Sequence, residues 1–126
     1  MVTADAGDIP RHRIPILTTF DPPPGYRVER VLGPCWGITV RSRSILGTTL
    51  ASLQTMFGGE ITAFTELANR SRNEAMDRLE SQAMQMGANT VLGMRFDSSD
   101  LMESTNEIIA YGTAVVVVPT EKPAAS

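Results

Sequence analysis

Arginine and serine alternate over four positions of the chain, Arg41-Ser42-Arg43-Ser44, and these residue types suit an anionic ligand. Guanidinium groups form paired hydrogen bonds to carboxylates and phosphates, and serine hydroxyls add further donors. A helix predicted to begin at Ser44 would contribute the free N–H groups of its first turn. Arg41, Ser42, Arg43 and Ser44 therefore form a candidate anion site. The alternative is that these arginines pair with Asp or Glu of a neighbouring subunit.

Ligands for a soft metal are scarce, because the chain has one cysteine, Cys35, and one histidine, His12. A structural zinc site takes four Cys or His ligands, so a single chain cannot build one. A ring of subunits could bring several copies of Cys35 together, which makes Cys35 a candidate ligand for a heavy-metal ion. The alternative is a buried free thiol, since free cysteine is among the most buried residue types.

Catalysis is not indicated, so we expect that the protein is not an enzyme. A nucleophile needs a nearby base, and His12 lies in an N-terminal segment predicted to be outside the domain. The net charge of −3 opposes nucleic-acid binding, and no run of 18 apolar residues predicts a membrane span. The first 15 residues contain no apolar signal sequence, and a lone cysteine forms no internal disulfide. We therefore expect a cytoplasmic protein.

The hydrophobic pattern predicts one small α+β domain over residues 14–119, between flexible tails at 1–13 and 120–126. An extended run over 14–20 and a proline-rich loop come first. The elements expected after them are strands at 26–32 and 37–43, a helix at 44–57, a longer helix at 62–86 that ends at Gly87, strands at 90–97 and 107–118, and a polar loop at 98–106 between these last two strands. The longer helix is expected to place Glu66, Arg70, Glu74 and Arg78 on a solvated face and to bury a stripe of Phe64, Leu67, Ala68, Ser71, Ala75, Leu79, Ala83 and Met86. Leu92, Met94 and Phe96 are expected on one face of their strand.

Apolar residues occupy both faces of the last predicted strand. One face is small, Ala110-Gly112-Ala114, and would let the long helix approach closely. The opposite face is formed by larger side chains: Ile109, Tyr111, Val115 and Val117. Because a Val-rich face left in water promotes aggregation, this second face needs a cover. The shorter helix of the same chain and a second subunit are both open as that cover.

Several short motifs occur in a fixed order along the chain: Leu17-Thr18-Thr19, Gly25-Tyr26, Leu32-Gly33, Arg41-Ser42-Arg43-Ser44-Ile45, Gly58-Gly59, Arg72 with Glu74-Ala75, Gly87-Ala88-Asn89 and Gly112-Thr113-Ala114-Val115. Together they resemble the YbjQ-like family, which carries a heavy-metal-binding label. The Arg-Ser-Arg-Ser run together with Tyr111-Gly112-Thr113-Ala114-Val115-Val116 is similar to one branch of that family. The chain departs from the main branch at Glu60, where an arginine is common.

The resemblance implies a βαβ-type, dodecin-like subunit with a small mixed or antiparallel sheet, which assembles into a ring-shaped homopentamer. We therefore expect a homo-oligomeric binding or assembly module whose partner is the protein itself. Heavy-metal binding, with ligands assembled at the ring axis or at subunit interfaces, is the alternative function.

Overall fold

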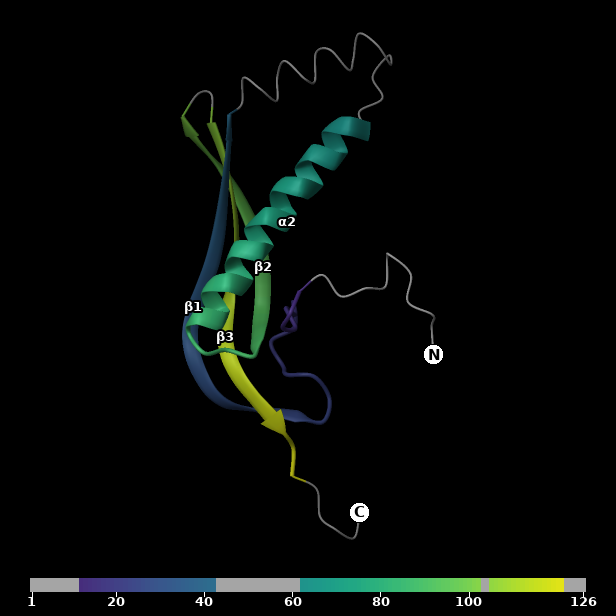
Figure 1. Ribbon diagram of the computed structural model, residues 1–126, viewed down its shortest axis with the longest axis vertical. Helices are drawn as coiled ribbons and strands as arrows, with labels where there is room; N and C mark the ends of the chain where they lie inside the picture. The colour runs from purple at the N-terminus through teal and green to yellow at the C-terminus, as the bar shows by residue number, and fades with distance from the viewer. Residues whose placement is uncertain (1–11, 43–61, 103–104, 122–126) are drawn as a thin grey trace.

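The computed structural model describes residues 12–42, 62–102 and 105–121. Its elements follow the order β1 (Tyr26–Ser42), α2 (Thr62–Gln85), β2 (Thr90–Met102) and β3 (Thr105–Pro119). The three strands form one antiparallel sheet, and α2 lies along one of its faces (Figure 1). The predicted α+β class, with a small antiparallel sheet and a long helix, is confirmed. The shorter helix predicted at 44–57 lies outside the described residues.

Strand β3 lies between the other two strands, in the order β1-β3-β2. Both β1 and β2 run antiparallel to β3, so they run parallel to each other. Helix α2 is therefore a crossover between two parallel strands that do not touch. This is a split βαβ arrangement, in which the last strand of the chain fills the gap.

The prediction of two separate strands at 26–32 and 37–43 was wrong, because β1 is one strand of 17 residues. It pairs with β3 from Tyr26, opposite Pro119, to Ser42, opposite Thr105. Gly33 has φ +126° and lies at a register shift, so it forms a bulge where the end of a strand was predicted. The missing N–H of the following proline is tolerated because β1 is an edge strand.

The predicted loop over 98–106 was also wrong. Strand β2 continues to Met102 and β3 begins at Thr105. Ser98, Ser99 and Asp100 of this extension are polar and exposed. Ser99 donates a hydrogen bond to Glu107 across the pair at 3.0 Å. Polar side chains in an exposed hairpin carry no apolar alternation, which is the signal the strand prediction needed.

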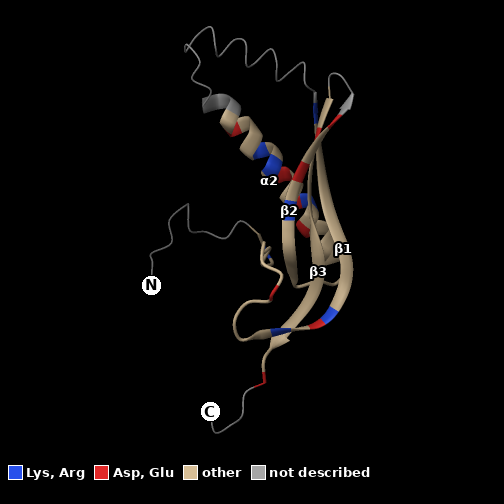
Figure 2. Ribbon diagram, turned by 180° about the vertical axis from the view of Figure 1, so that it is seen from behind, with Lys and Arg blue, Asp and Glu red and all other residues tan. Residues whose placement is uncertain are grey.

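Helix α2 buries a stripe of Ser71, Ala75, Leu79 and Ala83, all predicted to face the core. Charged residues lie along the rest of the helix and near the strand ends (Figure 2). The predicted stop at Gly87 is confirmed, with φ +96°. Other predicted members of the stripe are less covered: Leu67 and Met86 are half-buried, and Ala68 is exposed.

The helix comes closest to the sheet at Gly37 of β1. A Cβ at Gly37 would lie 2.2 Å from the carbonyl oxygen of Ala75. The small face of β3 does pack in the helix-side core, since Ala110 and Ala114 are fully buried there. A Cβ at Gly112, however, would meet Val91 of β2 at 2.8 Å. Gly112 therefore accommodates a neighbouring strand, whereas the prediction assigned it to helix approach.

Strand β2 changes face at Gly93, where φ is +64° and the pairing register shifts. The sequence pattern predicted Leu92, Met94 and Phe96 on one face, and this was wrong for Leu92. Met94 belongs to the helix-side core, whereas Leu92 packs on the other face of the sheet with Val115 and Val117. Because of the bulge, β2 places apolar side chains on both faces of the sheet.

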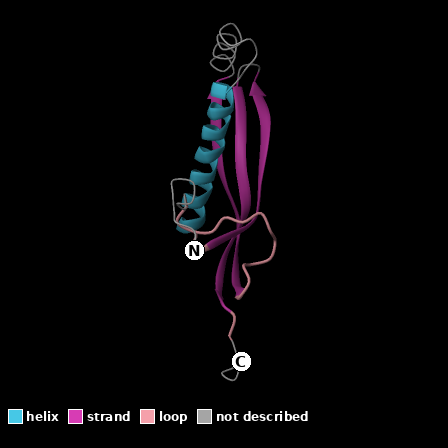
Figure 3. Cartoon of the chain, turned by 90° about the vertical axis from the view of Figure 1, so that its right-hand side faces the viewer, coloured by secondary structure: helices cyan, strands magenta, loops and turns pink. Residues whose placement is uncertain are grey.

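Residues 12–21, called the strap below, wrap around the free edge of β2 (Figure 3). Ile14 and Ile16 pack against the helix-side core, and Leu17 packs against the cluster on the opposite face. Backbone hydrogen bonds fasten the strap to the edge of β2: Val91 N to Pro15 O (3.0 Å), Leu17 N to Val91 O (2.8 Å), Met94 N to Leu17 O (2.9 Å) and Gly93 N to Thr19 O (2.8 Å). The predicted extended run over 14–20 thus serves as a partial fourth strand.

Candidate functional site

Arg41, the first residue of the predicted anion site, is held within the chain. Its Nε donates to Ser71 Oγ at 3.0 Å, and its Nη2 donates to Glu74 Oε1 at 2.6 Å. Both side chains of the ion pair are about one-third exposed. The guanidinium therefore joins β1 to α2 and has a carboxylate partner already. The pairing alternative placed the partner in a neighbouring subunit, whereas Glu74 belongs to the same chain.

The structure does not describe the side chains of the other three members of the predicted anion site. Arg43 and Ser44 lie outside the described residues, as does the side chain of Ser42. An anion site at this position stays a prediction.

Cys35 lies on the helix-facing side of β1 and is fully buried. Its Sγ donates to the Gly112 carbonyl oxygen at 3.7 Å. Burial raises the pKa of the Cys35 thiol to about 11, because the thiolate would lose its water. Metals bind the thiolate, so both access and ionisation oppose a ligand role here. A metal could reach Cys35 only if α2 separated from the sheet.

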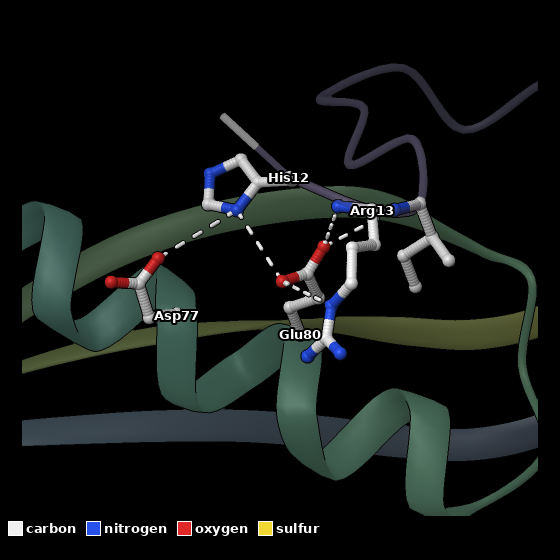
Figure 4. Close-up of polar contacts among 5 residues, drawn as sticks. His12, Arg13, Asp77 and Glu80 are labelled. Carbon is white, nitrogen blue, oxygen red and sulfur yellow. Dashed lines mark hydrogen bonds and ion pairs between the residues drawn. The ribbon is translucent and has the colours of Figure 1, made fainter. Parts of the chain in front are cut away.

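A group of polar residues that the sequence analysis did not single out joins the strap to α2 (Figure 4). Glu80 is buried and accepts hydrogen bonds from the backbone N–H groups of Arg13 and Ile14. His12 Nδ1 lies 3.8 Å from both Asp77 Oδ1 and Glu80 Oε1. Across the residues with described positions, no three Cys, His, Asp or Glu side chains are arranged to hold a metal ion.

No sequence pattern could have found this group. Glu80 follows Leu79 on a helix with many surface carboxylates, and its burial comes from the strap folding over it. His12 and Arg13 were assigned to the predicted tail over 1–13. In the structure these two residues lie against α2.

The sheet face opposite α2 carries a row of apolar side chains on β1 and β3 that no other described residue covers. Cys35, Gly37 and Thr39 are buried on the helix side, so the residues between them point away from α2. Trp36 is paired with Tyr111, and Ile38 with Ile109. We call this surface the apolar stripe: Val31, Trp36, Ile38, Val40, Ile109 and Tyr111.

Exposure separates the apolar stripe from the rest of this face. Val31 is 68% exposed, Val40 50%, Trp36 45% and Tyr111 42%. Val115 and Val117, further along β3, are buried in the cluster that Leu17 of the strap covers. Among the described residues, the strap covers one end of the face and no other segment covers the stripe. The sequence pattern predicted that this face of β3 needs a cover, from the shorter helix or from a second subunit, but did not reveal the larger contribution of β1.

A shallow groove of about 240 Å³ lies between α2 and β2 on the helix side. The Arg72 guanidinium lies 5.5 Å from the centre of the Phe96 ring there. The groove is lined by Ala68, Arg72, Phe96, Asp97, Ser98 and Ile108. Its volume is below the range of about 300–1,000 Å³ usual for ligand pockets.

These features define a small α+β subunit with one covered and one open sheet face, and without a recognisable reaction centre among its described residues. No helix in the described ranges is long and apolar enough to cross a membrane. The chain matches the YbjQ family, described as "Putative heavy-metal-binding", over residues 15–118. It belongs to that family, as the motif order predicted. Membership of the particular branch stays a prediction.

Similar proteins occur in bacteria and archaea. A UPF0145 protein of Burkholderia thailandensis is 50% identical over 103 residues, which cover 82% of this chain and 92% of the relative. A UPF0145 protein of Picrophilus torridus is 49% identical over 106 residues, covering 84% and 90%. A solved structure of a DUF74-family protein of unknown function from Pediococcus pentosaceus has a TM-score of 0.50 at 14% identity, covering 83% of this chain and 98% of that one. This last likeness concerns the fold alone.

Proposed function

We propose that the protein is a homo-oligomeric binding or assembly module of the cytoplasm, and not an enzyme, in which the apolar stripe is the subunit contact. The stripe is the observation that carries the proposal. It extends along β1 from Val31 to Val40, a length of about 30 Å at the usual rise of a strand. A monomer seldom leaves so long a row of large apolar side chains in water.

The edge of β1 favours packing through the face of the sheet. Gln82 Oε1 accepts the outward-facing N–H of Trp36 at 2.6 Å, and Arg78 Nη1 donates to the Ile38 carbonyl oxygen at 2.5 Å. These helix side chains occupy backbone groups that a strand of another copy would need for edge-to-edge pairing. The partner is therefore expected to lie on the stripe, above the plane of the strands.

The geometry of contact determines the number of subunits. If the stripe packs on the same stripe of a second copy, the assembly closes as a dimer. If it packs on a different surface of the next copy, the contact repeats and can close as a ring. The family resemblance favours the ring, with five subunits.

The test compares the two tyrosines of the chain, which have similar exposure but different positions. Tyr111 is 42% exposed within the stripe, and Tyr26 is 46% exposed at the other end of β1. Tyr111→Glu is expected to reduce the assembly to single chains, because it places a carboxylate in the apolar contact. Arg95 lies opposite position 111 on β2 and can pair with that carboxylate within the single chain. Tyr26→Glu is the matched control and should leave the assembly intact.

Native mass spectrometry of the tag-free protein at micromolar concentration gives the subunit number, and circular dichroism confirms that both variants fold. A wild-type mass of one 13.6 kDa chain would refute the proposal. A wild-type oligomer that both variants retain would place the contact elsewhere and refute the role of the stripe.

Heavy-metal binding is the alternative function, and it is supported by the family description and by Cys35. The burial of that thiol weighs against it. Cys35→Ser should abolish stoichiometric uptake of a soft metal such as Cd²⁺ if Cys35 is the ligand. Unchanged uptake would reject this site.

A further inference from the structure

The strap is attached to α2 through one buried carboxylate. The side chain of Glu80 is 7% exposed, and its Oε2 accepts the backbone N–H groups of both Arg13 and Ile14. A buried carboxylate needs such donors, because nothing else replaces the water it has lost. Glu80 therefore fixes the point at which the strap leaves the helix and turns toward β2.

His12 lies beside this attachment with an unsatisfied ring nitrogen. Its side chain is 14% exposed, and Nδ1 is buried without a hydrogen-bond partner. Two carboxylate oxygens, Asp77 Oδ1 and Glu80 Oε1, lie 3.8 Å from it. A carboxylate oxygen can only accept a hydrogen bond, so a neutral ring with its lone pair on Nδ1 has nothing to bond there. A neutral ring with its proton on Nδ1 would direct an N–H at the carboxylates but carry no charge, whereas a protonated ring presents the N–H together with a positive charge.

We propose that His12 is a proton-operated latch that fastens the strap to α2. An imidazole changes its charge between about pH 5 and pH 8. With the proton bound, His12 is a cation between Asp77 and Glu80 and holds the strap against the helix. When the proton is lost, this attraction ends and the strap loosens.

The charged groups that face His12 support this direction of the effect. Asp77 and Glu80 face it from α2, and both favour the cation. Arg13, its neighbour on the strap, opposes the cation, but its side chain is 72% exposed and its Nε lies 3.9 Å from Glu80 Oε1. Water therefore screens Arg13 more than it screens Glu80.

Loosening the strap would uncover two surfaces that it protects. One is the edge of β2 at Val91, Gly93 and Met94, whose N–H groups bond to strap carbonyls. The other is the apolar cluster of Leu92, Val115 and Val117, which Leu17 covers. The strap, α2 and β2 all belong to one chain, so the latch does not require the proposed assembly.

Hydrogen exchange measured by mass spectrometry on the full chain tests the latch. After correction for the intrinsic pH dependence of exchange, the amides of Val91, Gly93 and Met94 should be about tenfold less protected near pH 8 than near pH 5.8. Amides in the middle of β3 serve as the internal reference and should not change. His12→Gln should give the low protection at both pH values.

Two further measurements make the result specific. Arg13→Gln is the matched control on the strap and should keep the pH dependence. Because His12 is the one histidine of the chain, its ring C–H signals can be followed directly by NMR. The Leu17 methyl signals of the wild type should shift with the same midpoint as the ring. Equal protection at both pH values, pH dependence that persists in His12→Gln, or different NMR midpoints would each overturn the latch.

Discussion

The contact between α2 and β1 predicts a severe effect of a single added methyl group, in Gly37→Ala. The new Cβ would lie 2.2 Å from the Ala75 carbonyl oxygen and 2.4 Å from the Leu79 amide nitrogen. Both atoms belong to the helix backbone, so neither can rotate away. Helix α2 would have to retreat by about 1 Å to restore ordinary contact near 3.4 Å.

The size of the effect follows from what this retreat separates. Ala75, Leu79 and Ala83 are fully buried against the sheet, as are Cys35 and Ala110 below them. A gap of 0.5–1 Å removes about a quarter to a half of the attraction at each contact. Overpacked cores lose about 1–3 kcal/mol when side chains can adjust. Since only backbone can move here, we expect Gly37→Ala to lower the free energy of unfolding by about 3–5 kcal/mol.

Urea unfolding followed by far-UV circular dichroism, at one fixed protein concentration, measures this loss. Gly87→Ala is the matched control: Gly87 has φ +96° but nothing lies within 4 Å of an added Cβ. Its cost comes from the left-handed backbone alone and should be about 1 kcal/mol. If Gly37→Ala costs no more than Gly87→Ala, with an equal slope in urea, the reasoning about close packing is refuted.

Four further predictions concern polar side chains of the helix–sheet contact. A double-mutant cycle of Arg41→Gln and Glu74→Gln should give a coupling of about 0.5–1 kcal/mol that falls in about 1 M salt, because the pair is part-exposed; zero coupling would contradict the assigned tie. Thr39→Val should leave stability unchanged or raise it slightly in urea unfolding, since the buried Thr39 hydroxyl has no hydrogen-bond partner among the described residues; a loss above about 1 kcal/mol would reveal a partner. Burial raises the Cys35 pKa to about 11, so near pH 8 a thiol reagent should react at least about tenfold more slowly with the native than with the urea-unfolded protein. The same shift means that the fold favours the neutral thiol, so the free energy of unfolding should fall as pH rises from about 9 toward 11, and a flat profile there would contradict the burial.

Periodic apolar patterns were sufficient to predict the parts of the fold that they specify. The helix over 62–86 and its stop at Gly87 were predicted because a stripe at helical spacing and a left-handed glycine are both local signals. The joining of 26–32 and 37–43 into one strand was not. Gly33-Pro34 is locally a strand end, and only pairing with β3 along its whole length makes it a bulge.

The candidate sites were harder to predict, because their residues meet through tertiary structure. Arg41 was correctly singled out as part of a charged cluster, but its partner Glu74 was assigned to a solvated helix face. The contact of His12 with Glu80 depends on the strap crossing the helix, which no spacing encodes. The apolar stripe was predicted only in part. The contribution of β3 was predicted because its two-faced apolar pattern is continuous in sequence, whereas the contribution of β1 was missed because polar residues interrupt it.

The position of β3 between β1 and β2 restricts how the chain can be synthesised and folded. Strand β1 is made first, yet its partner in the sheet, β3, is the last of the described strands to be made. Strand β2 likewise has no strand partner until β3 emerges, apart from the strap. The sheet therefore forms only after β3 has left the ribosome, and its long-range pairings make folding slow. A nascent or truncated chain that lacks β3 holds two unpaired apolar strands at once, which makes the interval before β3 emerges the period of greatest need for chaperone protection.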